Sequence, residues 1–203
     1  MKKPTLNKAE MTKQFIIEKS APIFNKKGIA GTSLSDLTKA TGLTKGSIYG
    51  NFKDKDDVAV CVFQYNVDNL ISYLNRAMDK KKTCVGKLLA FPESYKRLYR
   101  HMITFGGCPI MNTAIEADDT HKPLSQMTKD VISHIKNDIT GLLDKGKRLG
   151  EIKESIDTLK TADIIISLIE GGLFLSKLTG EKNYLMHSLE QVETVIQSSA
   201  EGD

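Results

Sequence analysis

The segment from Thr32 to Lys55, TSLSDLTKATGLTKGSIYGNFKDK, decides the fold of the first part of this chain. Its first half is predicted to form a short helix, because inward-facing residues recur there at helical spacing: Leu34, Leu37 and Thr41. Ser33, followed three residues later by Asp36, resembles a capping box in which Asp replaces Glu. The helix is therefore expected to begin directly after Ser33.

A glycine turn and a second short helix follow. Gly42 can adopt the left-handed conformation between the helices, and Thr44 can cap the next helix through its hydroxyl. Ile48 and Phe52, four residues apart, would bury this second helix against the first. Three of its side chains then point outward: Lys45, Ser47 and Tyr49. This order predicts a helix-turn-helix motif, which places its second helix in the major groove of DNA.

The basic charge of the chain is concentrated around this motif. Residues 1 to 57 hold 11 Lys and Arg against 6 Asp and Glu, whereas the remainder holds 18 against 19. This asymmetry fits contact with DNA phosphates by one end of the chain. A solvated lysine-rich surface would give the same counts, so charge alone does not decide.

The second helix of the motif, expected over Lys45 to Phe52, would enter the major groove. Gly46 and Gly50 lie opposite its buried edge and would let the backbone approach the DNA, at a cost of about 1 kcal/mol each relative to alanine. Few of the outward side chains can make bidentate base contacts, so part of the specificity would come from DNA shape. The residues expected to bind DNA are Thr32, Ser33, Thr44, Lys45, Gly46, Ser47, Tyr49, Asn51, Lys53 and Lys55.

The order and spacing of these residues resemble the TetR family of bacterial transcriptional regulators. The resemblance is carried by Phe15, Ile16, Ile17, Ala21, Ile23 and Phe24, by Lys27-Gly28 and Thr32-Ser33, and by Tyr49, Phe52 and Lys53. A further matching segment is GGCPIMNTAIEADD, residues 106 to 119. The resemblance implies a homodimeric repressor that binds a double-stranded DNA operator, typically a palindrome, and is released by a small-molecule effector. The position of Gly50 is often bulky in relatives, so this chain departs from the family pattern there.

The whole sequence predicts an all-α protein of about nine helices, because proline is scarce and no segment alternates at strand period. A three-helix DNA-binding domain is expected over residues 1–53, and a larger helical ligand-binding and dimerisation domain over residues 54–203. Outside the motif, the expected helices are Leu6–Lys27, Asp54–Met78, Thr83–Thr104, a short one from Pro109, Pro123–Leu149, Thr158–Leu178 and Asn183–Ser198. Pro22 should bend the first of them.

The last two helices are predicted to form the dimer interface. The helix from Thr158 is apolar nearly all round, which requires burial on two sides, and the final helix carries apolar residues at coiled-coil spacing. Paired with its copy, this hairpin would form a four-helix bundle about a two-fold axis. Burial of both helices within one subunit is the alternative. The expected interface residues are Ile165, Leu168, Gly172, Leu175, Leu185, Leu189, Val192 and Ile196.

A ligand pocket is expected in the larger domain, although Met and aromatic residues at helical spacing more often form ordinary core. Asn112 is a polar amide in an apolar helix and needs a partner. Cys108 stands at the expected start of a helix, where a thiolate is favoured; it is either a sensor of electrophiles or oxidants, or a small buried residue in a tight turn. The pocket candidates are Tyr65, Phe91, Tyr95, Met102, Phe105, Cys108, Met111, Asn112, Ile115, Ile135 and Ile169.

Other classes of function lack a signature in this sequence. No nucleophile elbow or phosphate loop is present, so we expect neither an enzyme nor a cofactor. The acidic residues and histidine between Glu116 and His121 lack the spacing of a known metal motif, so no metal site is expected. Three cysteines without a CxxC pair, and the absence of a signal peptide or membrane span, predict a cytoplasmic protein. The alternative function is a helical interaction module without specific DNA binding, and activation rather than repression stays open.

Overall fold

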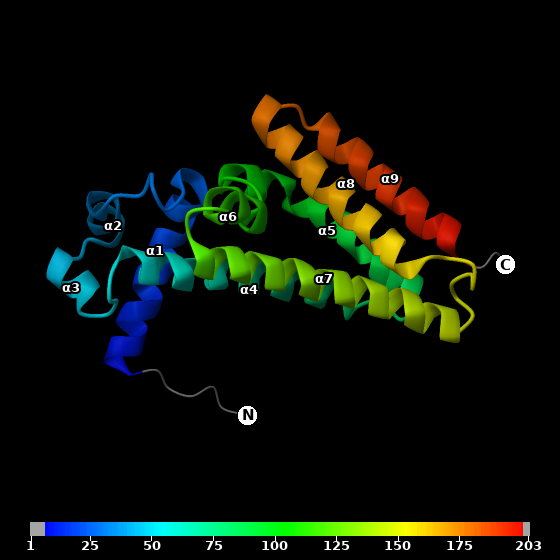
Figure 1. Ribbon diagram of the computed structural model, residues 1–203, viewed down its shortest axis with the longest axis horizontal. Coiled ribbons are helices and arrows are strands. Elements are labelled where there is room, and N and C mark those ends of the chain that lie inside the picture. The colour runs from blue at the N-terminus through cyan, green and yellow to red at the C-terminus, as the bar shows by residue number, and fades with distance from the viewer. Residues whose placement is uncertain (1–6, 201–203) are drawn as a thin grey trace.

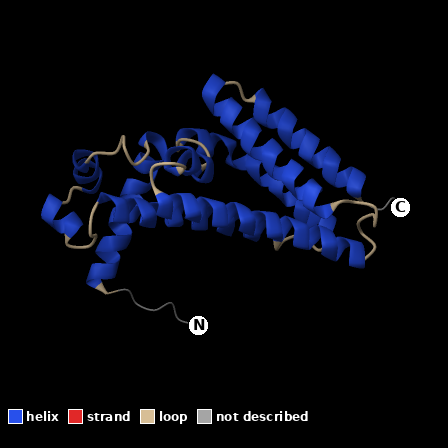
Figure 2. Cartoon of the chain, viewed as in Figure 1, coloured by secondary structure: helices blue, strands red, loops and turns tan. Residues whose placement is uncertain are grey.

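Helices account for almost all regular structure in the computed structural model, which describes residues 7–200 (Figure 2). Within that range the one extended pairing is an isolated bridge between Ile152 and Ala200. The all-α prediction is confirmed, while Leu6, the expected start of the first helix, lies outside the described residues. The helices are α1 (Lys8–Lys27), α2 (Leu34–Thr41), α3 (Lys45–Tyr49), α4 (Lys55–Met78), α5 (Cys84–Thr104), α6 (Pro109–Ala117), α7 (Lys122–Arg148), α8 (Thr158–Thr179) and α9 (Asn183–Ser199).

The first three helices gather at one end of the molecule, on the left of Figure 1. α1 begins in a capping box, in which Asn7 Oδ1 accepts from the Glu10 backbone N–H at 2.9 Å and Glu10 Oε2 accepts from the Asn7 N–H at 2.7 Å. Pro22 lies inside α1, and Gly28 closes the helix with a φ of 70°. α1 packs against both α2 and α4, so it connects the small motif to the rest of the chain.

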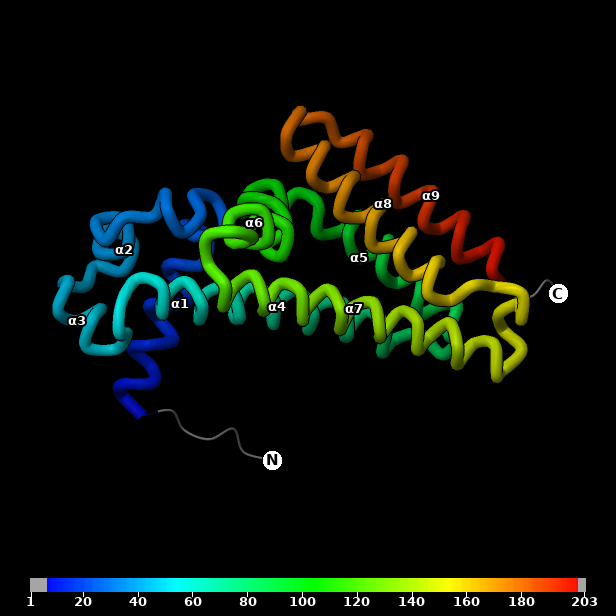
Figure 3. Tube along the Cα trace, viewed as in Figure 1, coloured from blue at the N-terminus to red at the C-terminus, as the bar shows by residue number. Residues whose placement is uncertain are grey.

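The remaining six helices form an elongated body. α4, α5, α7 and α8 are its long helices, and α6 packs mainly on α7. α8 and α9 form a hairpin whose helices lie side by side and pack on α5 and α7 (Figure 3). No helix of the described residues has the length and apolarity needed to cross a bilayer.

Buried apolar side chains form one cluster that extends through both parts of the molecule. At the end formed by α1, α2 and α3 the cluster includes Ile16, Leu37 and Ile48, and in the body it includes Leu88 and Leu143. All five side chains are 0% exposed. Because the cluster is continuous through α1, α4 and α6, packing fixes how the motif sits on the body.

Candidate nucleic-acid interface and its connection to the body

The helix-turn-helix motif is formed as predicted. Ser33 Oγ accepts from the Asp36 backbone N–H at 3.1 Å, and Asp36 Oδ2 accepts from the Ser33 N–H at 2.9 Å. Gly42 adopts the left-handed conformation with a φ of 69°. Thr44 Oγ1 then accepts from the Ser47 N–H at 3.2 Å. Both helix starts and the turn between them are therefore held by hydrogen bonds among neighbours in sequence.

One edge of α3 is buried, and the opposite edge faces solvent. Ile48 and, just after α3, Phe52 are 0% and 3% exposed and belong to the same core cluster as Leu37 of α2. The Lys13 ammonium lies 5.1 Å from the centre of the Phe52 ring. The exposed positions are Thr44, Lys45, Gly46 and Ser47. This edge presents one positive charge, two hydroxyls and a bare backbone, groups that suit contact with phosphates and base edges.

α3 is shorter than expected, because it ends at Tyr49 rather than at Phe52. The Gly50 N–H donates to the Gly46 carbonyl at 2.9 Å, and the Asn51 side-chain amide donates to the Ser47 carbonyl at 2.8 Å. These bonds satisfy carbonyls that a longer helix would have used. One amide hydrogen of Asn51 is thereby occupied within the motif.

Two residues predicted to bind DNA instead stabilise the turn between α1 and α2. Thr32 is 1% exposed, and its hydroxyl donates to the Gly28 carbonyl at 2.5 Å. The Lys55 ammonium donates to the carbonyls of Ile29 at 2.7 Å and Thr32 at 3.1 Å. The prediction for Thr32 was wrong, and Lys55 is a clamp inside the motif, because the buried carbonyls of a tight turn need donors. Ser33 and Lys53 stay exposed.

An ion pair ties the start of α2 to the end of α1. Lys27 Nζ lies 2.7 Å from Asp36 Oδ1. The hydrogen bond from Lys27, with those from the backbone and side chain of Ser33, holds the pKa of Asp36 well below its ordinary value. The Asp36 carboxylate is therefore ionised at neutral pH and cancels one positive charge near the exposed edge.

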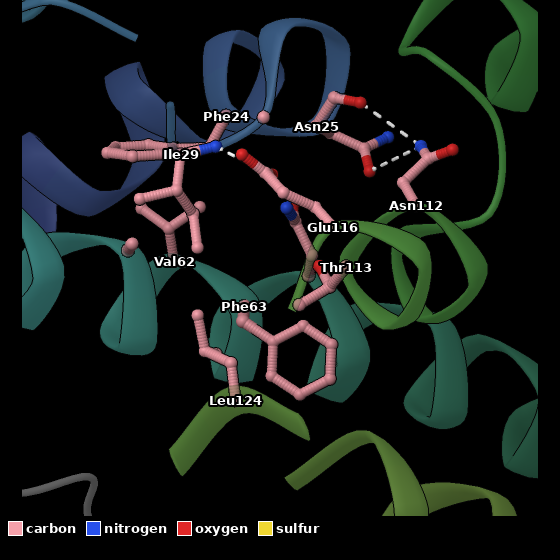
Figure 4. A pocket seen from close by; sticks show the side chains of 12 residues that line it. Phe24, Asn25, Ile29, Val62, Phe63, Asn112, Thr113, Glu116 and Leu124 are labelled. Atoms are coloured by element: carbon pink, nitrogen blue, oxygen red, sulfur yellow. Dashed lines mark hydrogen bonds between the residues drawn. The ribbon is translucent and has the colours of Figure 1, made fainter. Parts of the chain in front are cut away.

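A polar network joins α1 and the turn after it to α6 (Figure 4). Glu116 on α6 accepts from the backbone N–H groups of Ile29 at 2.8 Å and Ala30 at 2.7 Å. Asn112, one turn earlier, donates to the backbone oxygen and to Oδ1 of Asn25, both at 3.1 Å. Hydrogen bonds to a charged acceptor contribute about 1.5–3 kcal/mol each. A displacement of α6 would therefore pull directly on the turn that precedes α2.

The same network reaches the α5–α6 connection and α8. Asn25 Nδ2 donates to the carbonyls of Phe105 at 2.6 Å and Gly107 at 3.1 Å. Lys177 on α8 donates to Asn112 Oδ1 at 2.9 Å. Asn112, predicted to bind ligand, thus has its amide occupied by the protein. Sequence reasoning missed the role of Glu116, because only the folded chain brings it to a turn some 86 residues away.

Comparisons with known proteins agree with this architecture. Residues 16–60 match the family model of bacterial regulatory proteins of the tetR family, and residues 84–192 match that of the tetracyclin repressor-like C-terminal domain. A crystallised transcriptional regulator of the TetR family from Cytophaga hutchinsonii is 39% identical, with a TM-score of 0.93 over 98% of this chain and 100% of that one. The chain belongs to the TetR family.

Two further relatives extend the comparison. A TetR transcriptional regulator from Chloroflexus aurantiacus J-10-FL is 31% identical, with a TM-score of 0.90 over 96% of this chain and 98% of that one. The HTH-type transcriptional repressor BepR of Brucella suis biovar 1 is 23% identical over 96% of this chain and 94% of its own length. This TetR-family chain is accordingly a DNA-binding transcriptional regulator, and these relatives are regulators rather than enzymes.

The residues predicted to bind a ligand in this TetR-family chain fall in separate places. Tyr65, Met102 and Phe105 line a groove of about 460 Å³ between α1, α4 and α5. A separate cavity of about 20 Å³, enough for roughly one water molecule, is lined by Phe91, Tyr95, Ile135 and Ile169. Ile115 is 62% exposed on α6, so its assignment to a pocket was wrong. Met111 packs partly buried against the core, as an ordinary core residue does.

Cys108 is a buried thiol. It is 3% exposed, and its S–H donates to Glu170 Oε1 at 3.2 Å. Burial, together with the neighbouring Glu170 carboxyl, raises the pKa of Cys108 well above its ordinary value. Desolvation therefore disfavours the thiolate that a sensor would need, although Cys108 stands at a helix start. Burial also raises the pKa of Glu170 to about 6, and its Oε2 has no hydrogen-bond partner among the described residues.

Most of the predicted dimer interface is buried inside one subunit. Five of the predicted residues are at most 1% exposed within the single chain: Ile165, Leu185, Leu189, Val192 and Ile196. A Cβ on Gly172 would lie 2.6 Å from Ser188 Oγ, so this glycine serves the close approach of α8 to α9. These six residues are therefore covered within the subunit, where α9 packs its apolar seam on α5 and α8.

The unpartnered apolar surface lies instead on the outer face of α8. Its residues alternate at four- and three-residue spacing, as in a coiled-coil seam: Ile164, Leu168, Gly171, Leu175 and Leu178. Leu178 is 68% exposed and the neighbouring Phe174 42%. We call these six residues the α8 seam. Leu168 and Leu175, both predicted for the interface, belong to it.

Proposed function

We propose that this protein is a homodimeric repressor, which binds a palindromic operator through α3 and leaves it when a small molecule binds. Residues 1–53 would form the DNA-binding domain, and residues 54–203 the ligand-binding and dimerisation domain. The observation that carries the proposal is the exposed edge of α3, capped by Thr44 and kept free of bulk by Gly46. The relative named a repressor supports this sign of regulation.

The exposed edge of α3 would face the floor of the major groove. Lys45 reaches a phosphate or a guanine edge, and Ser47 with Tyr49 supplies hydroxyls for phosphates or a ring for a thymine methyl. Lys53, exposed after α3, anchors to the backbone beside the groove. Gly46 has no neighbouring side-chain atom closer than Thr44 Oγ1 at 3.9 Å from a Cβ position, so its surface is open for close approach.

The α8 seam would supply the dimer contact. Its alternating spacing matches the seam of paired helices, and exposed apolar residues in such a row favour burial against a copy of themselves. A two-fold dimer carries two copies of α3, which must lie about 34–36 Å apart to enter successive major grooves. Operator affinity would therefore be sensitive to any change in the position of the motif relative to α6.

The experiment is operator binding by the purified protein across a salt series, with the DNA that flanks its own gene. We expect a sequence-specific complex whose affinity falls steeply between 50 and 200 mM salt, by roughly a thousandfold for six phosphate contacts. Lys45→Ala with Tyr49→Ala should abolish this complex while the dimer stays folded. A double variant that binds as tightly as the wild type would refute the assignment of α3.

The second candidate function is a helical interaction module without specific DNA binding. It would show only weak, sequence-independent DNA binding in the same salt series. The exposed, capped α3 favours the repressor over this module. A regulator of this kind acts where the chromosome and reduced thiols are found, so we propose a cytoplasmic location, in line with three free cysteines.

A further inference from the structure

A groove is lined by α1 of the DNA-binding end and by α4 and α5 of the body. Its volume of about 460 Å³ lies within the range of about 300–1,000 Å³ typical of small-molecule sites. Asn25 contributes from α1, Tyr65 and Tyr73 from α4, and Phe105 from the end of α5. An occupant of this groove would touch the DNA-binding end and the body at the same time.

Flat aromatic surfaces dominate one part of this groove. Phe105 is 40% exposed, and its ring lies 4.2 Å from that of His101, centroid to centroid, at an interplanar angle of 30°. Tyr65 and Tyr73 face the same hollow from α4, two helical turns apart. Such rings favour a planar aromatic ligand, which stacks with centroids about 4.5–7 Å away.

Arg76 supplies the one cationic group of the lining that is always charged. It stands ten residues after Asn66 on α4, about 15 Å along the helix. Among residues 7–200 no carboxylate lies within ion-pair distance of its guanidinium. A guanidinium fork matches a carboxylate in a bidentate manner. Glu18, on α1, is the single acidic side chain of the lining and would repel an anion from its own part of the groove.

We propose that this groove is the effector site and that its ligand is a planar aromatic carboxylate. The ring system stacks on Tyr73, which lies one helical turn before Arg76 on α4, and the carboxylate pairs with Arg76. The effect on DNA binding rests on the proposed repressor function. A ligand between α1 and the end of α5 would contact Asn25, whose side-chain amide donates hydrogen bonds to the Phe105 and Gly107 carbonyls. It thereby favours a different placement of the DNA-binding end.

The first test measures ligand binding without DNA, with 2-naphthoate as the probe and 2-naphthamide as its uncharged counterpart. Calorimetric titration of the dimer should show naphthoate binding at least about tenfold more tightly than the amide, as expected for a charge-assisted pair. Arg76→Ala should weaken naphthoate about tenfold and leave amide binding the same. Arg100→Ala, at an exposed arginine of α5 outside the lining, is the matched control and should bind naphthoate as the wild type does.

Equal affinity for acid and amide, no binding of naphthoate at millimolar concentration, or wild-type naphthoate affinity in Arg76→Ala would each overturn the site. Circular dichroism of each variant checks folding. Tyr73→Leu provides a second route, since it removes a stacking ring and keeps Arg76; it should weaken acid and amide by the same factor. Unequal losses would contradict the stacking geometry.

The second test measures operator affinity with and without saturating naphthoate. We expect a fall of at least about fivefold in the wild type, no change in Arg76→Ala, and, by linkage, an equal fall of naphthoate affinity when operator is bound. Unchanged operator affinity with naphthoate bound would refute the regulatory role of the groove. A protein that binds naphthoate but no operator would refute the repressor function and leave the binding site standing.

Discussion

At the scale of single residues, the exposed surface of α3 is defined as much by an absent side chain as by those present. Gly46 sits at the second position of a helix of five residues, with open space where a Cβ would project. A glycine there weakens the helix and contributes no contact to the fold. Its presence is explained if the backbone of α3 has to come close to another molecule.

Gly46→Ala separates these two effects. Because the methyl group meets no atom closer than 3.9 Å, the folded protein should gain about 0.5 kcal/mol of unfolding free energy. Operator affinity should fall at least about tenfold, since the methyl group occupies the space through which the backbone approaches the DNA. Urea unfolding and fluorescence anisotropy with labelled operator measure the two quantities. An alanine variant that gains stability and keeps full affinity would show that α3 does not approach DNA closely here.

The titration of Glu170 should change the free energy of unfolding with pH. Burial raises its pKa from 4.5 to about 6, while it faces Cys108 of the α6 start and the Tyr95 hydroxyl of α5. A raised carboxyl pKa means that the folded state binds the proton more tightly than the unfolded state does. The resulting cost, about 2 kcal/mol for this shift, is fully present above pH 6 and disappears as pH falls below 4.5.

Glu170→Gln removes this titration, so the variant should be more stable than the wild type at pH 7.5. As pH is lowered from 7.5 to 5, that advantage should shrink by about 1–2 kcal/mol, because the wild-type carboxyl becomes protonated. Urea unfolding of both proteins at each pH gives the difference directly. Parallel pH profiles for the two proteins would show that Glu170 is not the buried acid described here.

At the scale of elements, α6 adds a polar connection between the two parts of the chain, beside the packing of α1 on α4. Its Glu116 carboxylate accepts from two consecutive N–H groups of the α1–α2 turn, so both oxygens are used. Glu116→Gln replaces one oxygen by an N–H₂ group that faces an N–H donor. We expect amide hydrogen exchange at Ile29 and Ala30 to accelerate about tenfold or more, as the loss of a charged acceptor implies.

Glu190→Gln, at an exposed glutamate of α9, is the matched control and should leave exchange at the α1–α2 turn unchanged. Operator affinity of Glu116→Gln provides a second measurement. A tenfold change of operator affinity in Glu116→Gln, with α3 intact, would show that the contact of α6 with the α1–α2 turn influences DNA binding. Equal exchange rates at Ile29 in the wild type and in Glu116→Gln would contradict the clamp.

The helices also show which features of the fold could be predicted from the sequence. Caps and turns follow from neighbours in sequence, so Ser33, Gly42 and Thr44 were predicted correctly with their roles. The seam of α9 was recognised as apolar, but spacing alone does not reveal which helix covers it. Glu116 offered no local signal, because its partners come from a distant turn. Contacts between residues close in sequence were predictable, and tertiary partners were not.

At the scale of the whole molecule, the α8 seam and the network around α6 belong to one chain of contacts. Lys177 projects from α8 to Asn112, and Asn112 holds Asn25 of α1. A dimer that packs through α8 would therefore be connected by hydrogen bonds to the helix that carries the DNA-binding motif. Because the apolar seam of α9 is buried within the subunit, α8 is the helix whose exposed apolar face needs a partner.

Leu175→Asp tests this arrangement, because it places a charge in the middle of the α8 seam, at a side chain that is 39% exposed in the single chain. We expect the variant to stay folded, to elute as a monomer of 22.5 kDa in size-exclusion chromatography with light scattering, and to lose operator affinity. The affinity falls because two half-sites are no longer bound by one linked pair of motifs, which costs about a hundredfold or more.

Leu149→Asp supplies the control, since Leu149 is 59% exposed after α7 and outside the α8 seam. It should remain dimeric and bind operator as the wild type does. Leu189→Asp should behave differently from both, because a charge buried at 0% exposure disrupts the subunit itself and costs several kcal/mol of unfolding free energy. A Leu175→Asp protein that remains a dimer would move the interface away from α8, and a folded monomeric Leu189→Asp would restore it to α9.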